Sequence, residues 1–228
     1  MIILVALVCI AAIVYGPQWW ASRTLRRYNG ELEHLPGTGG ELARHLLDRF
    51  QLQDVALELT GKGDHYDPQS RAVRLDEVHM QGRSLTAVAV AAHEVGHAIQ
   101  HASGYRPLAL RSRLVDATQW LERAGALLMI LFPVAVLLTR TPVTGLLVAI
   151  AGLVLLGFPV LVHLVTLPVE WDASFQRALP ILRDGNYIAG HELKAVERIL
   201  FACALTYVAA SLASLLNVAR WWMILRGA

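Results

Sequence analysis

The sequence predicts a mainly α-helical, polytopic membrane protein of about four spans with a small cytosolic α+β portion. Three observations lead to this fold class. The 228-residue chain is 55% hydrophobic and has a mean hydropathy of +0.46, which is too apolar for an ordinary soluble domain. Its apolar residues gather in long uncharged stretches. Between the first two stretches lies a polar region with short alternating runs and a His-Glu-Val-Gly-His motif.

The first predicted element is an N-terminal membrane anchor, residues 1–22. This stretch is uncharged, and residues 2–20 would span a bilayer at about 1.5 Å per residue. The basic residues Arg23, Arg26 and Arg27 follow the apolar run instead of preceding it. That order is wrong for a cleaved signal peptide, so we expect the anchor to be retained.

The polar region, residues 23–123, is predicted to be the cytosolic part. Residues 41–51 have the hydrophobic spacing of a helix. Residues 55–60 and 71–75 form two short extended runs, which we expect to pair as a β-hairpin. An exposed edge of this hairpin could hold a peptide by backbone pairing, or the hairpin could simply cover the core.

The motif His93-Glu94-Val95-Gly96-His97 carries the chemistry of the polar region. It follows an Ala/Val run, residues 87–92, that predicts a helix. Residues four apart share one helix face, so His93 and His97 can offer two imidazole nitrogens to one metal ion. Glu94, one step around the helix, is then a candidate general base for a zinc-bound water.

The C-terminal region, residues 124–228, contains the remaining spans. Residues 124–139 are uncharged but short for a span, 141–169 form the clearest membrane helix, and 199–219 form the last. A cytosolic loop, 168–198, is expected between the last two.

Basic residues gather after the first span, before the second and after the third, and the positive-inside rule places these segments in the cytoplasm, with both termini outside. Two spans separate His97 from Glu170, the acid that ends the 141–169 stretch. Both residues therefore emerge at the same membrane face, where a metal site could form. The small net charge of +2 gives no indication of nucleic-acid binding.

Three segments, residues 83–101, 167–174 and 204–210, resemble the YugP-type bacterial membrane zinc metallopeptidases, and the resemblance covers nearly the whole chain. It implies a zincin-like cytosolic portion with a gluzincin-like site, in which Glu170 is the third zinc ligand beside His93 and His97. Related peptidases of the HtpX type carry an Asp four residues beyond the ligand Glu. That position is Ser174 here, and Asp172 is the nearest acid, so either could orient a ligand histidine.

Several further residues are candidates. Asp184, in an Asp-Gly pair, is the alternative third ligand, as in site-2-type intramembrane proteases, and His101 lies one helical turn beyond His97. His163 and Tyr207, both inside predicted spans, could stabilise an oxyanion or pack against neighbouring helices.

The sequence thus predicts a zinc-dependent metalloendopeptidase in the bacterial inner membrane, with Glu94 as its base and its site facing the cytoplasm. Its expected partners are the lipid bilayer and polypeptide substrates, including membrane proteins. A site-2-type intramembrane protease and a non-catalytic zinc-binding scaffold are the alternatives. The scaffold would need the ligands but not Glu94.

Overall fold

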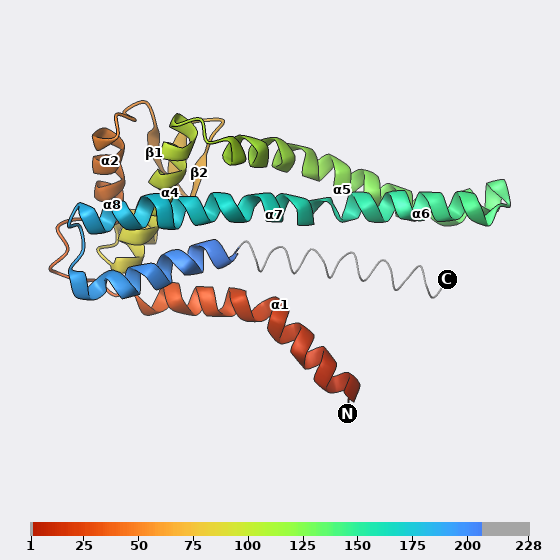
Figure 1. The fold of residues 1–228 in the computed structure, drawn as a ribbon, viewed down its shortest axis with the longest axis horizontal. Helices are drawn as coiled ribbons and strands as arrows, with labels where there is room; N and C mark the ends of the chain where they lie inside the picture. Colours follow the sequence, from red (N-terminus) through yellow and green to blue (C-terminus); the bar gives the residue numbers. More distant parts are fainter. Residues whose placement is uncertain (1, 207–228) are drawn as a thin grey trace.

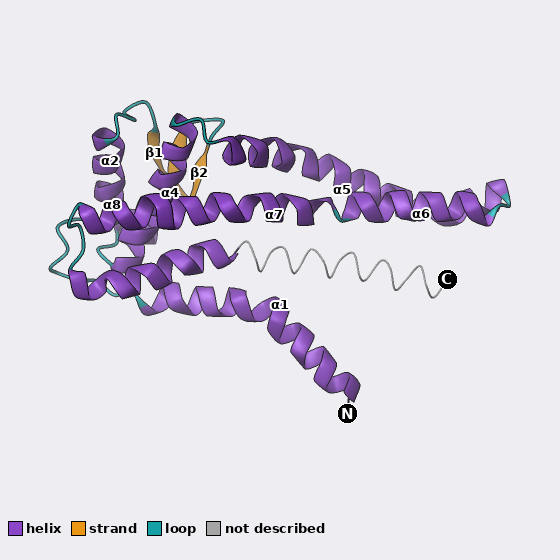
Figure 2. Cartoon of the chain, viewed as in Figure 1, coloured by secondary structure: helices purple, strands orange, loops and turns teal. Residues whose placement is uncertain are grey.

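The fold is built around one helix, α4 (Leu85–Ala102), with other elements packed along its length. The computed structural model describes residues 2–206. In chain order the elements are α1 (Ile2–Arg27), α2 (Gly39–Arg49), β1 (Ala56–Thr60), β2 (His65–Asp67), β3 (Ala72–Asp76), α3 (Glu77–Gln81), α4, α5 (Arg106–Thr139), α6 (Pro142–Leu156), α7 (Phe158–Trp171), the π-helix η1 (Asp172–Ala178), α8 (Leu179–Asp184) and the 3-10 helix η2 (Gly190–Glu192). Residues 193–206 are also helical. The chain is mainly helical with one small sheet, as predicted (Figure 2).

Helix α4 begins at Ser84, whose hydroxyl oxygen accepts a hydrogen bond from the backbone N–H of Ala87 and so caps the first turn. The small side chains of residues 87–92 let neighbouring elements approach closely, and α2, α3, β3 and η1 all pack against the helix. Nearly every residue of α4 is buried. The helix is therefore the core of the polar region, and its second half carries the His93–His97 motif.

The sheet differs from the predicted hairpin. Strands β1 and β3, which correspond to the two expected runs, pair in parallel, with Ala56 opposite Ala72. The intervening segment contains β2, which pairs antiparallel to the other side of β3 and gives the order β1-β3-β2. A short hairpin does form, but from β2 and β3. Strand β2 is thus an edge strand, and it contacts α4.

Helices α5, α6 and α7 form a long arm that extends away from the sheet (Figure 1). Helix α5 ends at Arg140, which adopts φ +54°, and α6 then runs back along α5. A Cβ on Gly125 would lie 3.1 Å from the carbonyl oxygen of Gly152, so the two backbones touch. Large apolar side chains on this arm are exposed, including Leu137, Leu138 and Leu147. An exposed apolar surface of this kind suits a lipid environment.

Two helices of the described part are long and apolar enough to cross a membrane, Arg106–Thr139 and Val143–Asp184. The first contains the predicted span 124–139, and the second contains all but the first two residues of the predicted span 141–169. The predicted anchor is helical as α1, but as a span it stays a prediction. The predicted span 199–219 lies mostly outside the described residues.

The segment 168–198, expected to be a loop, is largely helical because α7 continues through η1 into α8. Figure 1 shows α5 leaving the sheet end of the molecule and α7 returning to it. The sequence-based inference that His97 and Glu170 meet at one end of the arm therefore agrees with the arrangement of these helices.

Candidate metal centre

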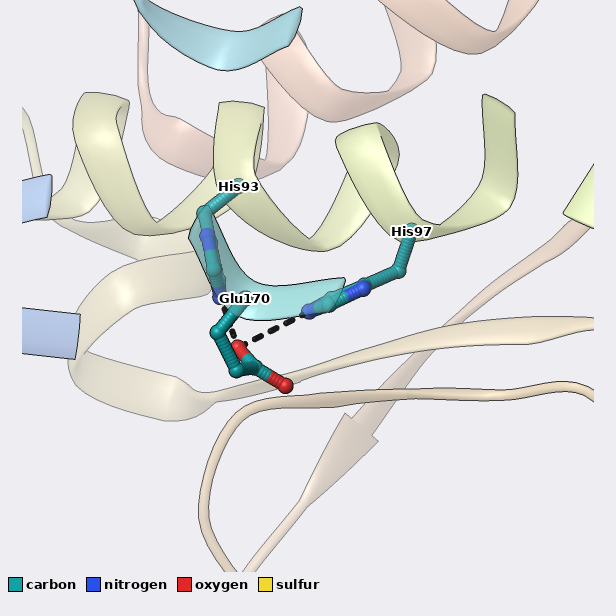
Figure 3. A group of neighbouring side chains, drawn as sticks. All are labelled: His93, His97 and Glu170. Carbon is teal, nitrogen blue, oxygen red and sulfur yellow. Dashed lines mark hydrogen bonds and ion pairs between the residues drawn. The ribbon is translucent and has the colours of Figure 1, made fainter. Parts of the chain in front are cut away.

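Two histidines of α4 and one glutamate of α7 converge on one point (Figure 3). Glu170 Oε2 lies 3.1 Å from His93 Nε2 and 3.2 Å from His97 Nε2. All three side chains are buried, and their potential ligand atoms lie within 4.8 Å of one another. Two imidazole nitrogens and a carboxylate oxygen are the donor set of many catalytic zinc sites. These three residues could therefore hold a metal ion.

The second carboxylate oxygen of Glu170 also fits a metal centre. Glu170 Oε1 is buried and has no hydrogen-bond partner in the described part of the chain. Nη2 of Arg111 lies 3.9 Å from it, which is within the range of an ion pair but too far for a hydrogen bond. A fully buried carboxylate with an unsatisfied oxygen is costly unless a cation compensates it. A divalent ion between Glu170 and the two histidines would provide that compensation.

His93 is oriented by Ser174 of η1. The Ser174 hydroxyl donates to the carbonyl oxygen of Leu200, at 3.3 Å, and its oxygen lies 3.1 Å from His93 Nδ1. Because the hydroxyl proton is directed to Leu200, the Ser174 oxygen accepts the Nδ1–H of His93. This tautomer leaves the Nε2 lone pair of His93 directed at Glu170 and available to a metal.

His97 is oriented by Gln100, a buried residue to which the sequence alone assigned no role. The His97 Nδ1–H donates to Gln100 Oε1 at 3.0 Å. The Gln100 amide in turn donates to the carbonyl oxygen of Val169 and to Asp172 Oδ2, each at 2.8 Å. Asp172 also accepts from Arg177 Nε at 2.7 Å. Asp172 and Ser174, the two candidates from sequence, thus act on different histidines.

Gly96 allows α4 and η1 to lie this close together. A Cβ at position 96 would sit 2.9 Å from the carbonyl oxygen of Ala173 and would clash with it. Glu170 and Ser174, on either side of this crossing point, both reach the α4 histidines. The contact between Gly96 and η1 therefore sets the distance between the two halves of the site.

Glu94 lies beside the histidines and is also buried. Burial is the main cause that raises the pKa of its carboxyl to about 7, with Glu170 and Asp64 raising it further and His93 opposing them. Glu94 lines a cavity of about 170 Å³ together with Asp64, His79 and His93. A carboxyl with a pKa near neutrality can both accept and release a proton.

The other sequence candidates lie outside this group. Asp184 is at the end of α8, is 65% exposed and accepts from Arg183, so it does not join the histidines as a third ligand. His101 Nδ1 is hydrogen-bonded to the Tyr66 hydroxyl at 2.7 Å. His163 lies in α7, about two turns before Glu170, and is not part of the metal group. Tyr207 lies outside the described residues.

A buried pair of histidines and a glutamate from a second helix form the donor set that is found in mononuclear zinc proteins of the His₂Glu type. A family model described as "Putative neutral zinc metallopeptidase" matches residues 1–226, and the chain belongs to this family. It is 42% identical over 192 residues to the "Putative membrane protease YugP" of Bacillus subtilis (strain 168), a match that covers 82% of this chain and 80% of the relative. No solved structure matches the chain. The resemblance seen in the sequence is confirmed, and zinc is the metal of this family.

Proposed function

We propose that this chain is a membrane-bound zinc endopeptidase with a gluzincin-like site, in which His93, His97 and Glu170 hold the ion and Glu94 is the general base. The observation that carries the proposal is the convergence of the three ligand atoms next to the buried carboxyl of Glu94, which lines a cavity together with His93. A structural zinc site would need a fourth protein ligand and would have no use for Glu94.

The residues of the chain divide the hydrolysis between them. Zinc held at the site would polarise the scissile carbonyl and make the attacking water more acidic. Glu94 takes a proton from that water as the water oxygen bonds to the carbonyl carbon. The protonated Glu94 then gives the proton to the amide nitrogen as the C–N bond breaks, which leaves a carboxylic acid and an amine.

The site lies at the end of the α5–α7 arm, and the positive-inside rule assigns that end to the cytoplasm. On this assignment the enzyme works at the inner face of the bacterial inner membrane. Its proposed substrates are polypeptides close to that face, namely membrane proteins or segments that leave the bilayer.

The test is metal dependence measured on detergent-purified protein with fluorescein-labelled casein. We expect about one zinc per chain in the wild type by elemental analysis. Hydrolysis should be lost on treatment with a chelator and restored by added zinc. Glu170→Gln should bind much less zinc, whereas Asp184→Asn, its control, should bind as much as the wild type. Zinc retention in Glu170→Gln with loss in Asp184→Asn would contradict the ligand set.

A further inference from the structure

Asp64 and His79 form a hydrogen-bonded pair that the metal site does not use. His79 Nδ1 lies 2.7 Å from Asp64 Oδ2, and each side chain is only 15% exposed. The other oxygen of Asp64 accepts the backbone N–H of Asp76 at 2.8 Å, while the Asp76 carboxylate accepts from the N–H of Gly63. The first of these hydrogen bonds holds the Asp64 carboxylate directly, and the second holds the adjoining turn. The Nδ1 atom of His79 therefore has a partner in a fixed position.

The backbone of His79 is also fixed. It belongs to α3, and a Cβ on Gly39 of α2 would lie only 2.3 Å from the His79 carbonyl oxygen, so the two helices are in direct backbone contact. With both its backbone and its Nδ1 atom fixed, the ring has one predominant orientation. Nε2 of His79 is the remaining ring atom that can serve a ligand.

The same cavity brings His79 together with the proposed base. His79, Asp64, Glu94 and His93 all line it. Of the other described residues lining this cavity, Thr206 already donates its hydroxyl proton to the carbonyl oxygen of Cys203, the Cys203 thiol is only a weak donor, and Leu25 and Val90 are apolar. His79 is therefore the lining side chain best able to donate a hydrogen bond to a substrate held there.

The charges around His79 favour its protonated form. Burial lowers the pKa of its imidazole, whereas the hydrogen bond and charge of Asp64 raise it, and the charges of Asp76 and Glu94 raise it further. The net direction is a raised pKa. A protonated imidazole whose Nδ1–H is bound by Asp64 presents a charged Nε2–H donor.

We propose that His79 is a further catalytic residue, whose Nε2–H donates a hydrogen bond to the oxygen that becomes negative as water adds to the scissile carbonyl, with Asp64 positioning the ring. This inference rests on the proposed hydrolysis. A donor placed where charge develops stabilises the transition state more than the bound substrate. Its loss should therefore lower kcat with little change in KM.

The experiment compares His79→Phe, His79→Asn and His79→Gln with wild type on fluorescein-labelled casein. Loss of one such donor lowers kcat about 100-fold, so we expect this loss for Phe and for the shorter Asn. The longer glutamine side chain of His79→Gln can place an amide N–H closer to the substrate oxygen, so this variant should recover part of the lost kcat. His45→Phe is the matched control, because His45 is bonded to Tyr187 outside this cavity. Zinc content and thermal unfolding are measured for each variant. If His79→Phe fails to fold, the comparison of kcat between His79→Asn and His79→Gln tests the role of His79.

A second readout does not depend on turnover. In the inactive Glu94→Gln background, the Kd for labelled casein, measured by fluorescence anisotropy, should change less than threefold when His79→Asn is added. A kcat for His79→Asn within threefold of wild type, or a casein Kd weakened as much as kcat, would overturn the role of His79. Failure of the proposed function looks different, because wild-type hydrolysis would then persist after chelation.

Discussion

At the scale of single residues, each proposed ligand histidine depends on a polar neighbour that is not itself one of the three proposed ligands. Ser174 directs His93, and Gln100 directs His97 while linking it to Asp172 and to the backbone of α7. Such neighbours fix the tautomer and the ring orientation, so their loss commonly weakens metal binding by about 10- to 100-fold. Gln100 has the larger role because it joins three groups from two helices.

The first prediction concerns Gln100. Gln100→Leu should weaken zinc affinity about 10- to 100-fold, because His97 loses its acceptor and the Asp172 carboxylate loses a donor. Competition with a fluorescent zinc chelator measures the affinity. Gln53→Leu is the control, since Gln53 is exposed and its side-chain amide donates a hydrogen bond to the Asp48 carbonyl oxygen, away from the metal group. Equal zinc affinity in Gln100→Leu and wild type would contradict this role.

At the scale of elements, the site depends on how closely α4 and η1 cross. The crossing point is Gly96, which His97 follows directly and which lies three residues after His93 on α4. In an ordinary exposed helix, Gly→Ala stabilises by about 1 kcal/mol. Here the added Cβ would lie 2.9 Å from the Ala173 carbonyl oxygen. Because of this overpacking, the same substitution is expected to destabilise the protein.

Gly96→Ala should therefore destabilise the protein by about 1 to 3 kcal/mol and weaken zinc binding, because η1 must move away from α4 and takes Glu170 and Ser174 with it. Thermal unfolding with and without zinc measures both effects. Gly190→Ala, where an added Cβ meets nothing within 4 Å, should leave both unchanged. A stabilised Gly96→Ala protein would show that the close crossing has no role.

The element scale also shows what could be read from the sequence. The spacing of His93 and His97 predicts a shared helix face, and the uncharged stretch ending at Glu170 predicts a third group at the same end of the membrane spans. The pairing of β1 with β3 could not be predicted, because alternation fits parallel and antiparallel partners equally. Strand β2 has only three residues, too few to show a period.

Hydrogen bonds between side chains that are distant in sequence could not be predicted either. His79 bonds to Asp64, 15 residues away, and Gln100 bonds to Asp172, 72 residues away. No local pattern connects such pairs, since the first forms where the turn between β1 and β2 meets α3 and the second where η1 packs against α4. The helical course of residues 168–184 was missed because their charged residues were read as a loop between spans.

At the scale of the whole molecule, the α5–α7 arm separates the metal site from the α5–α6 turn at the far end (Figure 1). If the arm crosses the membrane, that turn and the site lie on opposite faces. The positive-inside rule predicts that the site then faces the cytoplasm, because basic residues gather near it.

Cysteine labelling tests this topology. In a background with Cys9 and Cys203 replaced by Ser, Thr141→Cys at the far turn should react with a membrane-impermeant maleimide in intact cells. Lys62→Cys, in the turn after β1, should react only after the inner membrane is permeabilised. The opposite pattern would reverse the orientation and place the site outside the cytoplasm.

The central claim is that Glu94 moves the proton at a zinc centre built by its neighbours. Glu94→Gln keeps the shape of the side chain but removes the base, so it should retain about one zinc per chain and lose at least 100-fold in kcat on labelled casein. Elemental analysis and initial rates on the same preparation measure the two quantities. Full hydrolysis by a zinc-loaded Glu94→Gln protein would contradict the account.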